Sequence, residues 1–565
     1  MRIRSHNLPV PSWNLWVFAL LPLVTVLVVF ILPYGASITG ALKKGEPGVL
    51  SGASLIPIVV FTLRQALFST LAALALGLPG AWFIGNRGSP FSRVLWVISA
   101  VPFALPSILV VLGFVLFFGN AGWANRFCMA LTGTKEGPLR ILYKPEAVIL
   151  AHGFYNFPLV IRLVGDGIHR IRKAYAPAAA SLGASPLKTA LTVLFPMAVP
   201  SLMAAALMVF LYSFTSFAVV LVLGGGPAAT TLAVEIYRYA RISLDFHSAG
   251  ILALLETSIA GIIFAGYLFF EKKAQALSPD IADRPLETRG TWLGTTVRLL
   301  YALGILVLVL GPVLSILGES FLARNSWAAT PSINLKWWRA LGERSIPALF
   351  RSLILAFFAA GLACILAMFA AGTAKYAEQG PGLSFLGTLL RVFTTAPLAS
   401  SGIVLGLGWI GLYGREHARS IGAVVVIHGV SGLPFAYHAL SQGLKSVPVN
   451  TLNAASVFGA GPIHQMISVA LPLSAQRLRS AWGFSAALSL GELNAVMMVG
   501  LEDWETLPLL IYRAVGSYRY GTACAAGTLL ILSCGFFFWA SQMGTGSGRY
   551  RGPVPRDIGN RFRAT

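Results

Sequence analysis

The stretch HGFYNFPLVIRLVGDGIHRIRKAYAPAAASLGASPLKTALTVLFP, residues 152–196, recurs without a gap as HGVSGLPFAYHALSQGLKSVPVNTLNAASVFGAGPIHQMISVALP, residues 428–472. Two copies this far apart are not the period of a solenoid, so two whole halves of the chain are copies of one module. Because glycine and proline dictate backbone shape, the repeated object is a bent loop, and two copies predict two equivalent docking sites for a two-fold symmetric partner. The matched positions are His152/His428, Gly153/Gly429, Pro158/Pro434, Ala178/Ala454, Ala179/Ala455, Gly183/Gly459, Ala184/Ala460, Pro186/Pro462, Val193/Val469 and Pro196/Pro472.

The composition indicates an integral membrane protein. Of the 565 residues, 56% are hydrophobic and 11% are charged, whereas soluble domains are roughly 45–50% apolar and about 25% charged. A helix needs about 20 apolar residues to cross the hydrocarbon, and such stretches recur along both halves. We expect an all-α fold with about twelve transmembrane helices, near residues 14–34, 56–82, 94–118, 146–165, 199–223, 248–270, 296–318, 348–370, 386–411, 421–440, 480–500 and 522–541.

The two halves are expected to have the same orientation in the membrane. Outside the core repeat, PFALPSILVVLG at 102–113 resembles PLASSGIVLGLG at 397–408, and each half contains about six spans. An even number of spans gives two parallel pseudo-repeats, with modules at 1–275 and 276–565 joined by a charged, turn-rich linker at 271–290. A modest excess of Lys and Arg in the loops on the side of the termini favours cytoplasmic N- and C-termini. The net charge of +22 is interpreted as anchoring to membrane lipids, not as nucleic-acid binding.

Each copy of the repeated loop predicts a helix, a sharp turn and a second helix. In the first copy an alanine-rich segment precedes Gly183, which supplies the left-handed residue that ends such a helix. Ser185 is a good N-cap, and Pro186 suits the first turn of the second helix. In the second copy Gly459 and Pro462 take the places of Gly183 and Pro186.

This pattern resembles the cytoplasmic EAA loop of ATP-binding-cassette (ABC) importer permeases, which begins Glu-Ala-Ala and continues through a glycine to an apolar residue and a proline at fixed spacing. The chain carries it twice, near 174–196 and near 450–472, and the leading glutamate is replaced by Pro177 and Asn453. An ordinary interhelical turn would not recur at the same spacing, so the chain is similar to a fused, two-module permease of type I importers. The loop residues concerned are Ala178, Ala179, Gly183, Pro186, Pro196, Ala454, Ala455, Gly459, Pro462 and Pro472.

The resemblance implies a transport subunit and not an enzyme. In such permeases each loop forms a coupling helix that binds in a groove on the ATPase. The implied partners are two copies of an ABC ATPase subunit and a periplasmic solute-binding protein, at the bacterial inner membrane. The sequence has no G-x-x-x-x-G-K-[ST] phosphate loop, so ATP and magnesium are expected on the partner subunits. No cofactor, metal or catalytic residue is assigned to this chain.

The resemblance also limits the range of expected cargo molecules. Fused permeases of this kind resemble the branch that imports thiamine or ferric iron, and AHGFYNFPLVIRL at 151–163, LGGGPAATTLAVEIY at 223–237 and TLPLLIYRAVGSYRYG at 506–521 are more similar to the thiamine permease. Thiamine or a phosphorylated form is therefore favoured, and ferric iron is the alternative. No metal or disulfide spacing links the four cysteines, which are Cys128, Cys364, Cys524 and Cys534.

Carboxylates inside the apolar spans are candidates for function, because they are costly in the membrane. Glu492 lies in LSLGELN together with Ser489 and Asn494, which suggests a polar face toward a translocation path that could guide an organic cation. A hydrogen bond between helices explains the same residues equally well. Glu256 is interpreted as an interhelical residue.

Two other classes of protein fit the sequence less well. A secondary transporter driven by an ion gradient would explain the duplication and the carboxylates within spans, but not the paired loops, and copurification of an ATPase distinguishes the two. A membrane-embedded enzyme would need a nucleophile with a base, or a metal site, and no such constellation is evident. His152 and His428 fit packing or backbone capping at the membrane edge better than metal binding.

Overall fold

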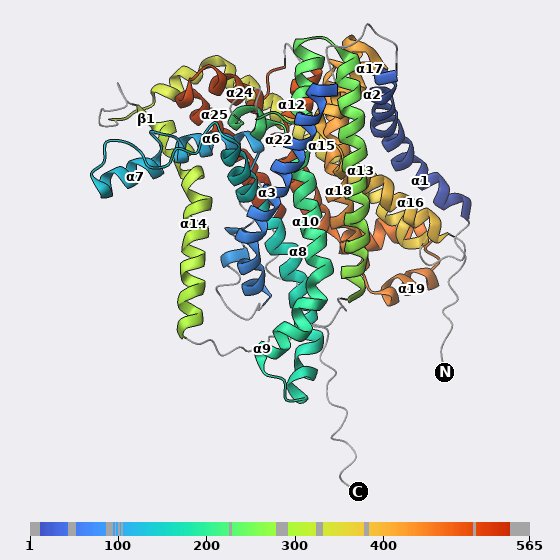
Figure 1. Ribbon diagram of the computed structural model, residues 1–565. Coiled ribbons are helices and arrows are strands. Elements are labelled where there is room, and N and C mark those ends of the chain that lie inside the picture. Colours follow the sequence, from blue (N-terminus) through green and yellow to red (C-terminus); the bar gives the residue numbers. More distant parts are fainter. Residues whose placement is uncertain are drawn as a thin grey trace.

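The computed structural model describes residues 12–42, 52–85, 94–96, 98–99, 102, 105–224, 226, 229–277, 292–323, 332–377, 383–500 and 504–542, and this part of the chain is almost entirely helical (Figure 1). The first half contains α1 (Ser12–Val26), the π-helical turn η1 (Leu27–Ile31), α2 (Leu32–Leu42), α3 (Gly52–Ile84), α6 (Ser107–Phe118), α7 (Trp123–Thr132), α8 (Pro145–Ser181), α9 (Pro186–Thr189), η2 (Ala190–Leu194), α10 (Phe195–Phe214), α11 (Ala218–Leu223), α12 (Leu232–Tyr237), η4 (Arg238–Ile242) and α13 (Phe246–Leu277). The second half contains α14 (Trp292–Phe321), β1 (Leu322–Ala323), β2 (Ser332–Ile333), α15 (Lys336–Ala377), α16 (Ser384–Thr395), η5 (Ala396–Ala399), α17 (Gly402–Ala418), α18 (Ile421–Lys445), α19 (Val449–Val457), α20 (Pro462–Gln465), η6 (Met466–Ala470), α21 (Leu471–Leu473), α22 (Ala475–Gly491), α23 (Asn494–Val499), α24 (Leu507–Gly516) and α25 (Tyr520–Gln542). The strands β1 and β2 form one short antiparallel pair.

The membrane-spanning helices confirm the predicted all-α membrane fold, with local differences. Within the described residues, ten helical segments are long and apolar enough to cross a bilayer, and the bent pair of α16 with α17 gives an eleventh if counted as one span. The span predicted near 94–118 starts later, since its helix begins at Ser107, after Pro106. The span predicted near 386–411 is bent, because its two helical parts meet at 103°. Pro397 and the N-cap Ser401 mark this bend.

The span predicted near 480–500 is also not one continuous helix. α22 ends at Gly491, Glu492 is extended with φ −75° and ψ 116°, and α23 begins at Asn494. The first half is interrupted in the same way between α10, which ends at Phe214, and α11, which begins at Ala218. The break is therefore a feature of the repeated module, and it places polar backbone in the middle of the bundle.

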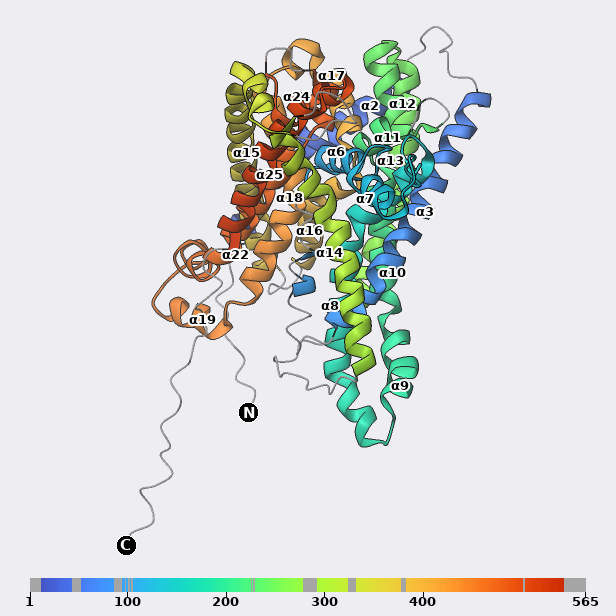
Figure 2. The ribbon, with the colours of Figure 1, turned by 90° about the vertical axis from the view of Figure 1, so that its left-hand side faces the viewer.

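The two halves show the same internal contacts. The hydroxyl of Thr62 accepts the N–H of Leu232 at 3.1 Å, and the hydroxyl of Ser352 accepts the N–H of Leu507 at 2.9 Å. The repeated loops, which contain α9 and α19, project from the same end of the bundle (Figures 1 and 2). This is the arrangement of parallel repeats. The predicted module boundary after residue 275 falls in the last turn of α13, and most of the predicted linker at 271–290 lies outside the described residues.

The first helices of the two halves lie at the interface between the halves. α2 packs between α13 of its own half and α17 of the other, and α14 packs between α25 of its own half and α6 of the other. Trp409 and Tyr413 of α17 donate to the carbonyl oxygens of Val29 and Val28 at 2.9 and 3.0 Å. On the opposite side, Tyr301 of α14 donates to the Leu76 carbonyl at 2.7 Å. The first helix of each half therefore packs against helices of both halves.

Candidate functional site

The two repeated loops adopt the same backbone conformation. Gly183 and Gly459 have φ angles of +78° and +81°. In the first loop the N–H of Gly183 donates to the Ala180 carbonyl and that of Ala184 to the Ala179 carbonyl, both at 3.0 Å. This pair of bonds is the Schellman motif, which ends a helix with one left-handed residue. The matched atoms of the second loop form the same two bonds at 2.9 and 3.0 Å, so the predicted left-handed turn is confirmed in both copies.

After the turn, each loop enters a short helix followed by a π-helical turn. In the first loop the hydroxyl of Ser185 accepts the N–H of Lys188 at 3.3 Å, which confirms the predicted cap. Gly461 has no side chain to do the same. There the side-chain amide of Gln465 donates to Ser456 Oγ at 2.8 Å and to the Ala460 carbonyl at 2.7 Å. Both loops are therefore held in shape by their own residues.

Large apolar side chains are exposed at matched positions of the loops. Leu182 is 87% exposed and its counterpart Phe458 is 90% exposed. Leu191 and Ile467, which also correspond, are 57% and 59% exposed. Apolar groups gathered at an exposed tip are typical of protein–protein or membrane interaction surfaces. Of the candidate loop residues, Ala178, Ala454, Pro196 and Pro472 are exposed, and Ala179 and Ala455 are half-buried.

The three candidate path residues, Ser489, Glu492 and Asn494, line one small cavity of about 250 Å³ between the two halves. Segments from both halves build its walls, since residues 105–107 and 215–218 come from the first half and residues 397–402 and 487–494 from the second. The breaks after α10 and α22 therefore meet at this cavity. Glu256 is buried in α13 and lines neither this cavity nor the larger one described below.

Several polar atoms around the small cavity have unused bonding capacity. Glu492 Oε1 accepts the backbone N–H groups of Asn494 and Ala495 at 2.9 and 3.2 Å, which fixes the carboxylate at the break. His428 Nδ1 lies 2.9 Å from Ser489 Oγ. Among the described residues, neither His428 Nε2 nor Asn494 Oδ1 has a hydrogen-bond partner, although both atoms are buried. A polar solute could satisfy them.

The matched site in the first half is satisfied internally. Ser216, at the position that corresponds to Glu492, lies 2.8 Å from His152 Nε2. His152 Nδ1 lies 3.2 Å from Gln65 Oε1 and 3.3 Å from Ser69 Oγ. Among the described lining residues, only the second half therefore contributes a carboxylate to the small cavity, which makes the charge around it asymmetric.

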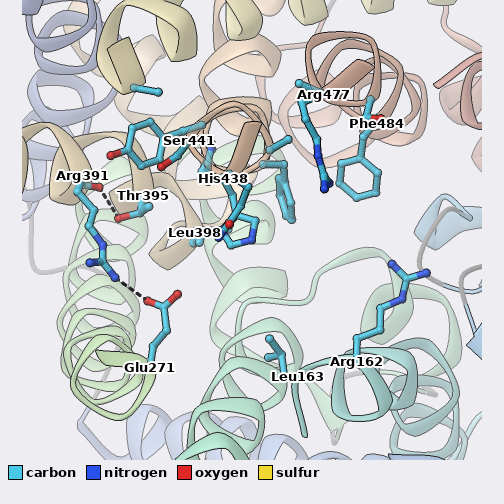
Figure 3. Close-up of a pocket in the computed structure, with 18 of the residues that line it drawn as sticks. Arg162, Leu163, Glu271, Arg391, Thr395, Leu398, His438, Ser441, Arg477 and Phe484 are labelled. Atoms are coloured by element: carbon cyan, nitrogen blue, oxygen red, sulfur yellow. Dashed lines mark hydrogen bonds and ion pairs between the residues drawn. The ribbon is translucent and has the colours of Figure 1, made fainter. Parts of the chain in front are cut away.

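A larger cavity of about 920 Å³ adjoins the small one (Figure 3). Tyr212, Leu398 and Phe435 line both cavities, so the two cavities are adjacent, and together they are called the route. Matched positions of the repeat line the larger cavity from both halves, as expected for a cavity near the pseudo-two-fold axis between the halves. These pairs are Leu159/Phe435, Arg162/His438, Leu163/Ala439 and Met208/Phe484.

Cationic side chains dominate the larger cavity. Glu271 pairs with Arg391 at 3.2 Å, which joins α13 of the first half to α16 of the second. Arg162 extends into the cavity from one side and Arg477, beside Phe484, from the opposite side (Figure 3). The other lysines and arginines among the described lining residues are Lys375 and Lys445. The cavity therefore keeps an excess of positive charge.

None of the residues of the larger cavity was predicted from the sequence. The signal that could have found it is the matched pair Arg162/His438, because ionisable residues recur there at the same place in a span of each half.

Comparisons with known proteins agree with this architecture. The family model described as "Binding-protein-dependent transport system inner membrane component" matches residues 77–275. The chain is 26% identical to the thiamine transport system permease protein ThiP of Haemophilus influenzae, over 85% of this chain and 87% of that protein. It is 28% identical to ThiP of Brucella suis, over 88% and 90%. It is also 30% identical to the "Putative 2-aminoethylphosphonate transport system permease protein PhnU" of Salmonella choleraesuis, over 46% of this chain and 93% of that protein.

Proposed function

Because the chain belongs to the family of binding-protein-dependent transport system inner membrane components, we propose that it is the permease subunit of an ABC importer for thiamine or thiamine phosphate. The thiamine permeases are similar along both modules, with 85–88% of this chain covered in the two relatives named above. The similarity to PhnU covers only the length of one module, 46% of this chain. The fused architecture therefore supports the thiamine branch.

The observation that carries the importer proposal is the pair of loops with identical turns and exposed apolar tips at one end of the bundle. Leu182 and Phe458 present an apolar side chain at the same place in each loop. Two equivalent surfaces suit two copies of one ATPase subunit, as the pseudo-symmetry of the chain requires. We place this end in the cytoplasm and the opposite end toward a periplasmic solute-binding protein.

The route supports an organic cation over ferric iron. Besides Glu492, the aromatic side chains Tyr155, Tyr212, Phe217 and Phe435 line the small cavity. A carboxylate among aromatic faces attracts an organic cation through charge and cation–π interactions. The excess of cationic side chains in the larger cavity repels a trivalent metal ion more strongly than a monovalent organic cation, because the Coulomb energy grows with the charge of the ion.

The test is reconstitution. The permease is placed in proteoliposomes with its cognate ATPase subunits and solute-binding protein, and uptake of labelled thiamine is measured with and without ATP. We expect uptake that needs ATP, both partners and the permease. Uptake driven by an ion gradient without the ATPase would instead support a secondary transporter. Uptake of ferric iron in place of thiamine would contradict the assignment of thiamine as the cargo.

Cysteine labelling tests the orientation. In a Cys128→Ser background the three remaining native cysteines are buried. Cysteines placed at Ser185 and at Gly461 are expected to react with an impermeant maleimide only from the cytoplasmic side, and one at Gly133 only from outside. Reaction of the Ser185 and Gly461 positions from opposite sides would rule out parallel repeats. If all three positions reacted from the opposite sides, the loops would lie outside the cytoplasm and could not bind cytoplasmic ATPases.

Glu492→Gln tests the path. The glutamine oxygen can still accept the N–H groups of Asn494 and Ala495, so the break in the helix is kept. We expect cation uptake to fall by about tenfold, the equivalent of about 1.4 kcal/mol, with unchanged membrane insertion and ATPase binding. Glu256→Gln, at a residue that lines neither cavity, is expected to reduce the yield of folded protein before it affects transport. Normal uptake by Glu492→Gln would make Glu492 a residue that only caps α23.

A further inference from the structure

We propose that the two cavities form a bipolar route, in which Glu492 receives the cationic nitrogen of the cargo and Arg162 receives a phosphoryl or phosphonyl group at its other end. This inference rests on the proposed function and narrows the class of cargo. Its basis is the separation of charge along one route, with a carboxylate in the small cavity and an excess of guanidinium and ammonium groups in the larger one.

Arg162 is positioned as a binding residue. Its guanidinium lies over the Trp96 ring, with Cζ 4.8 Å from the ring centroid, in a cation–π contact. Among the described residues Arg162 forms no ion pair, and its buried Nε has no hydrogen-bond partner. Asp166, one turn along α8, is the carboxylate that acts on it electrostatically. A planar fork with free donors matches the oxygens of a phosphoryl group.

The surroundings of Arg162 argue against a role that is only anchoring at the membrane edge. Arg162 lies about one turn before the end of the span predicted near 146–165, and α8 continues past that span to Ser181. A lysine or arginine that only anchors the protein at the lipid headgroups would extend into solvent. Arg162 instead lies in the wall of a cavity, held by an aromatic ring.

The opposing wall supplies further cations. Arg477 extends toward the cavity from the side opposite Arg162 (Figure 3). The Lys375 ammonium is fixed by donating to the Leu444 carbonyl at 2.7 Å. Arg391 is neutralised by Glu271, so it contributes little net charge. An anionic group that enters between Arg162 and Arg477 would be attracted from both halves of the permease.

Aromatic side chains lie where the two cavities adjoin. Tyr212 and Phe435 line both cavities and offer faces on which a flat ring can stack. A cargo with an organic cation at one end and a phosphoryl group at the other fits this order. Thiamine phosphate has this chemistry, and so, without a ring, does 2-aminoethylphosphonate.

The inference is tested by protection of a cysteine in the cavity. Ser441→Cys, a lining position, is introduced in the Cys128→Ser background of the permease assembled with its ATPase in proteoliposomes, and its labelling rate is measured from the cytoplasmic side. The probes are thiamine, thiamine monophosphate, 2-aminoethylphosphonate and inorganic phosphate. Each is assayed with the parent, with Arg162→Gln and with Arg172→Gln. Arg172 is the matched control, because it lies on the same helix over Trp82, 5.5 Å from the centroid, and does not line the cavity.

We expect thiamine monophosphate and 2-aminoethylphosphonate to protect at lower concentrations than thiamine or phosphate. Arg162→Gln should raise the half-protecting concentration of thiamine monophosphate about tenfold or more and leave that of thiamine within about twofold, with partial rescue by Arg162→Lys. Arg172→Gln should change neither value.

Three results would overturn the inference: equal protection by thiamine and its phosphate, an equal effect of Arg162→Gln on both, or protection by inorganic phosphate as strong as by the phosphorylated cargo. ATP-driven uptake of thiamine by the parent is scored separately. If that uptake is normal but thiamine monophosphate does not protect better than thiamine, only this inference fails. If no thiamine compound is imported, the proposed function fails, and protection by 2-aminoethylphosphonate still decides whether the route is bipolar.

Discussion

Replacement of Gly183 or Gly459 by valine is expected to lower ATP-driven uptake by about 5- to 30-fold each, and the double replacement should leave almost none. Both glycines have left-handed φ angles, +78° and +81°, and an added Cβ would meet no atom within 4 Å at either. The effect is therefore backbone strain and not a clash. A β-branched residue in this conformation costs about 1–2 kcal/mol, a factor of about 5–30 in the population of the correct turn. The measurements are uptake and copurification of the ATPase.

The control for these variants is Gly461→Ser. Gly461 lies two residues after Gly459, has equally open surroundings and an ordinary φ, and serine is the residue of the first loop at this position. We expect its uptake to stay within about twofold of the parent, since serine is a good N-cap. Normal uptake and normal ATPase binding by both valine variants would mean that the loops do not couple, and the importer mechanism would have to be abandoned.

Gly408→Ala is expected to destabilise the whole permease. Gly408 of α17 lies directly against the backbone of Pro33, and an added Cβ would also lie 2.7 Å from Ser37 Oγ. Backbone cannot move aside as a flexible side chain can, so the helices must separate. Overpacking of this kind costs about 1–3 kcal/mol, and we expect a melting temperature lower by about 1–3 °C and a smaller yield of monodisperse protein.

Gly411→Ala separates this effect from a general sensitivity of α17. It faces the same helix one turn later, but its nearest neighbour is the Ala36 carbonyl oxygen at 3.9 Å, an ordinary contact distance. Its melting temperature should match that of the parent. Equal losses for the two variants, or none for Gly408→Ala, would contradict the close packing of α2 on α17.

The features that the sequence predicted correctly depend on neighbouring residues. The turn at Gly183 and the cap at Ser185 follow from the preferences of a few consecutive residues, and the spans follow from local hydropathy. The break at Glu492 was missed because the surrounding residues are apolar on average, so hydropathy alone cannot show that the helix stops there.

The features that could not be predicted depend on how helices are rotated and paired. Arg162 and Arg477 belong to different halves, and only the packing of α8 and α22 turns both toward one cavity. The local sequence marks Arg162 and His438 as ionisable residues at matched places in the spans, but it does not say toward which neighbouring helix they are turned. The packing of α2 and α14 between the halves likewise cannot be read from an alignment of the repeats, because the alignment contains no information on contacts between the halves.

The hydrogen bond from Trp409 to the Val29 carbonyl can form only late in the synthesis of the chain. The two residues are 380 positions apart in the chain. At about 5–20 residues per second, the ribosome needs roughly 20–80 s to reach the tryptophan after it has made the valine. During that interval the face of α2 that α17 will cover is exposed to lipid. In the same way, the face of α6 that packs against α14 is exposed until α14 has been synthesised. A translational pause within the second half therefore prolongs the time in which another membrane helix can occupy these two seams.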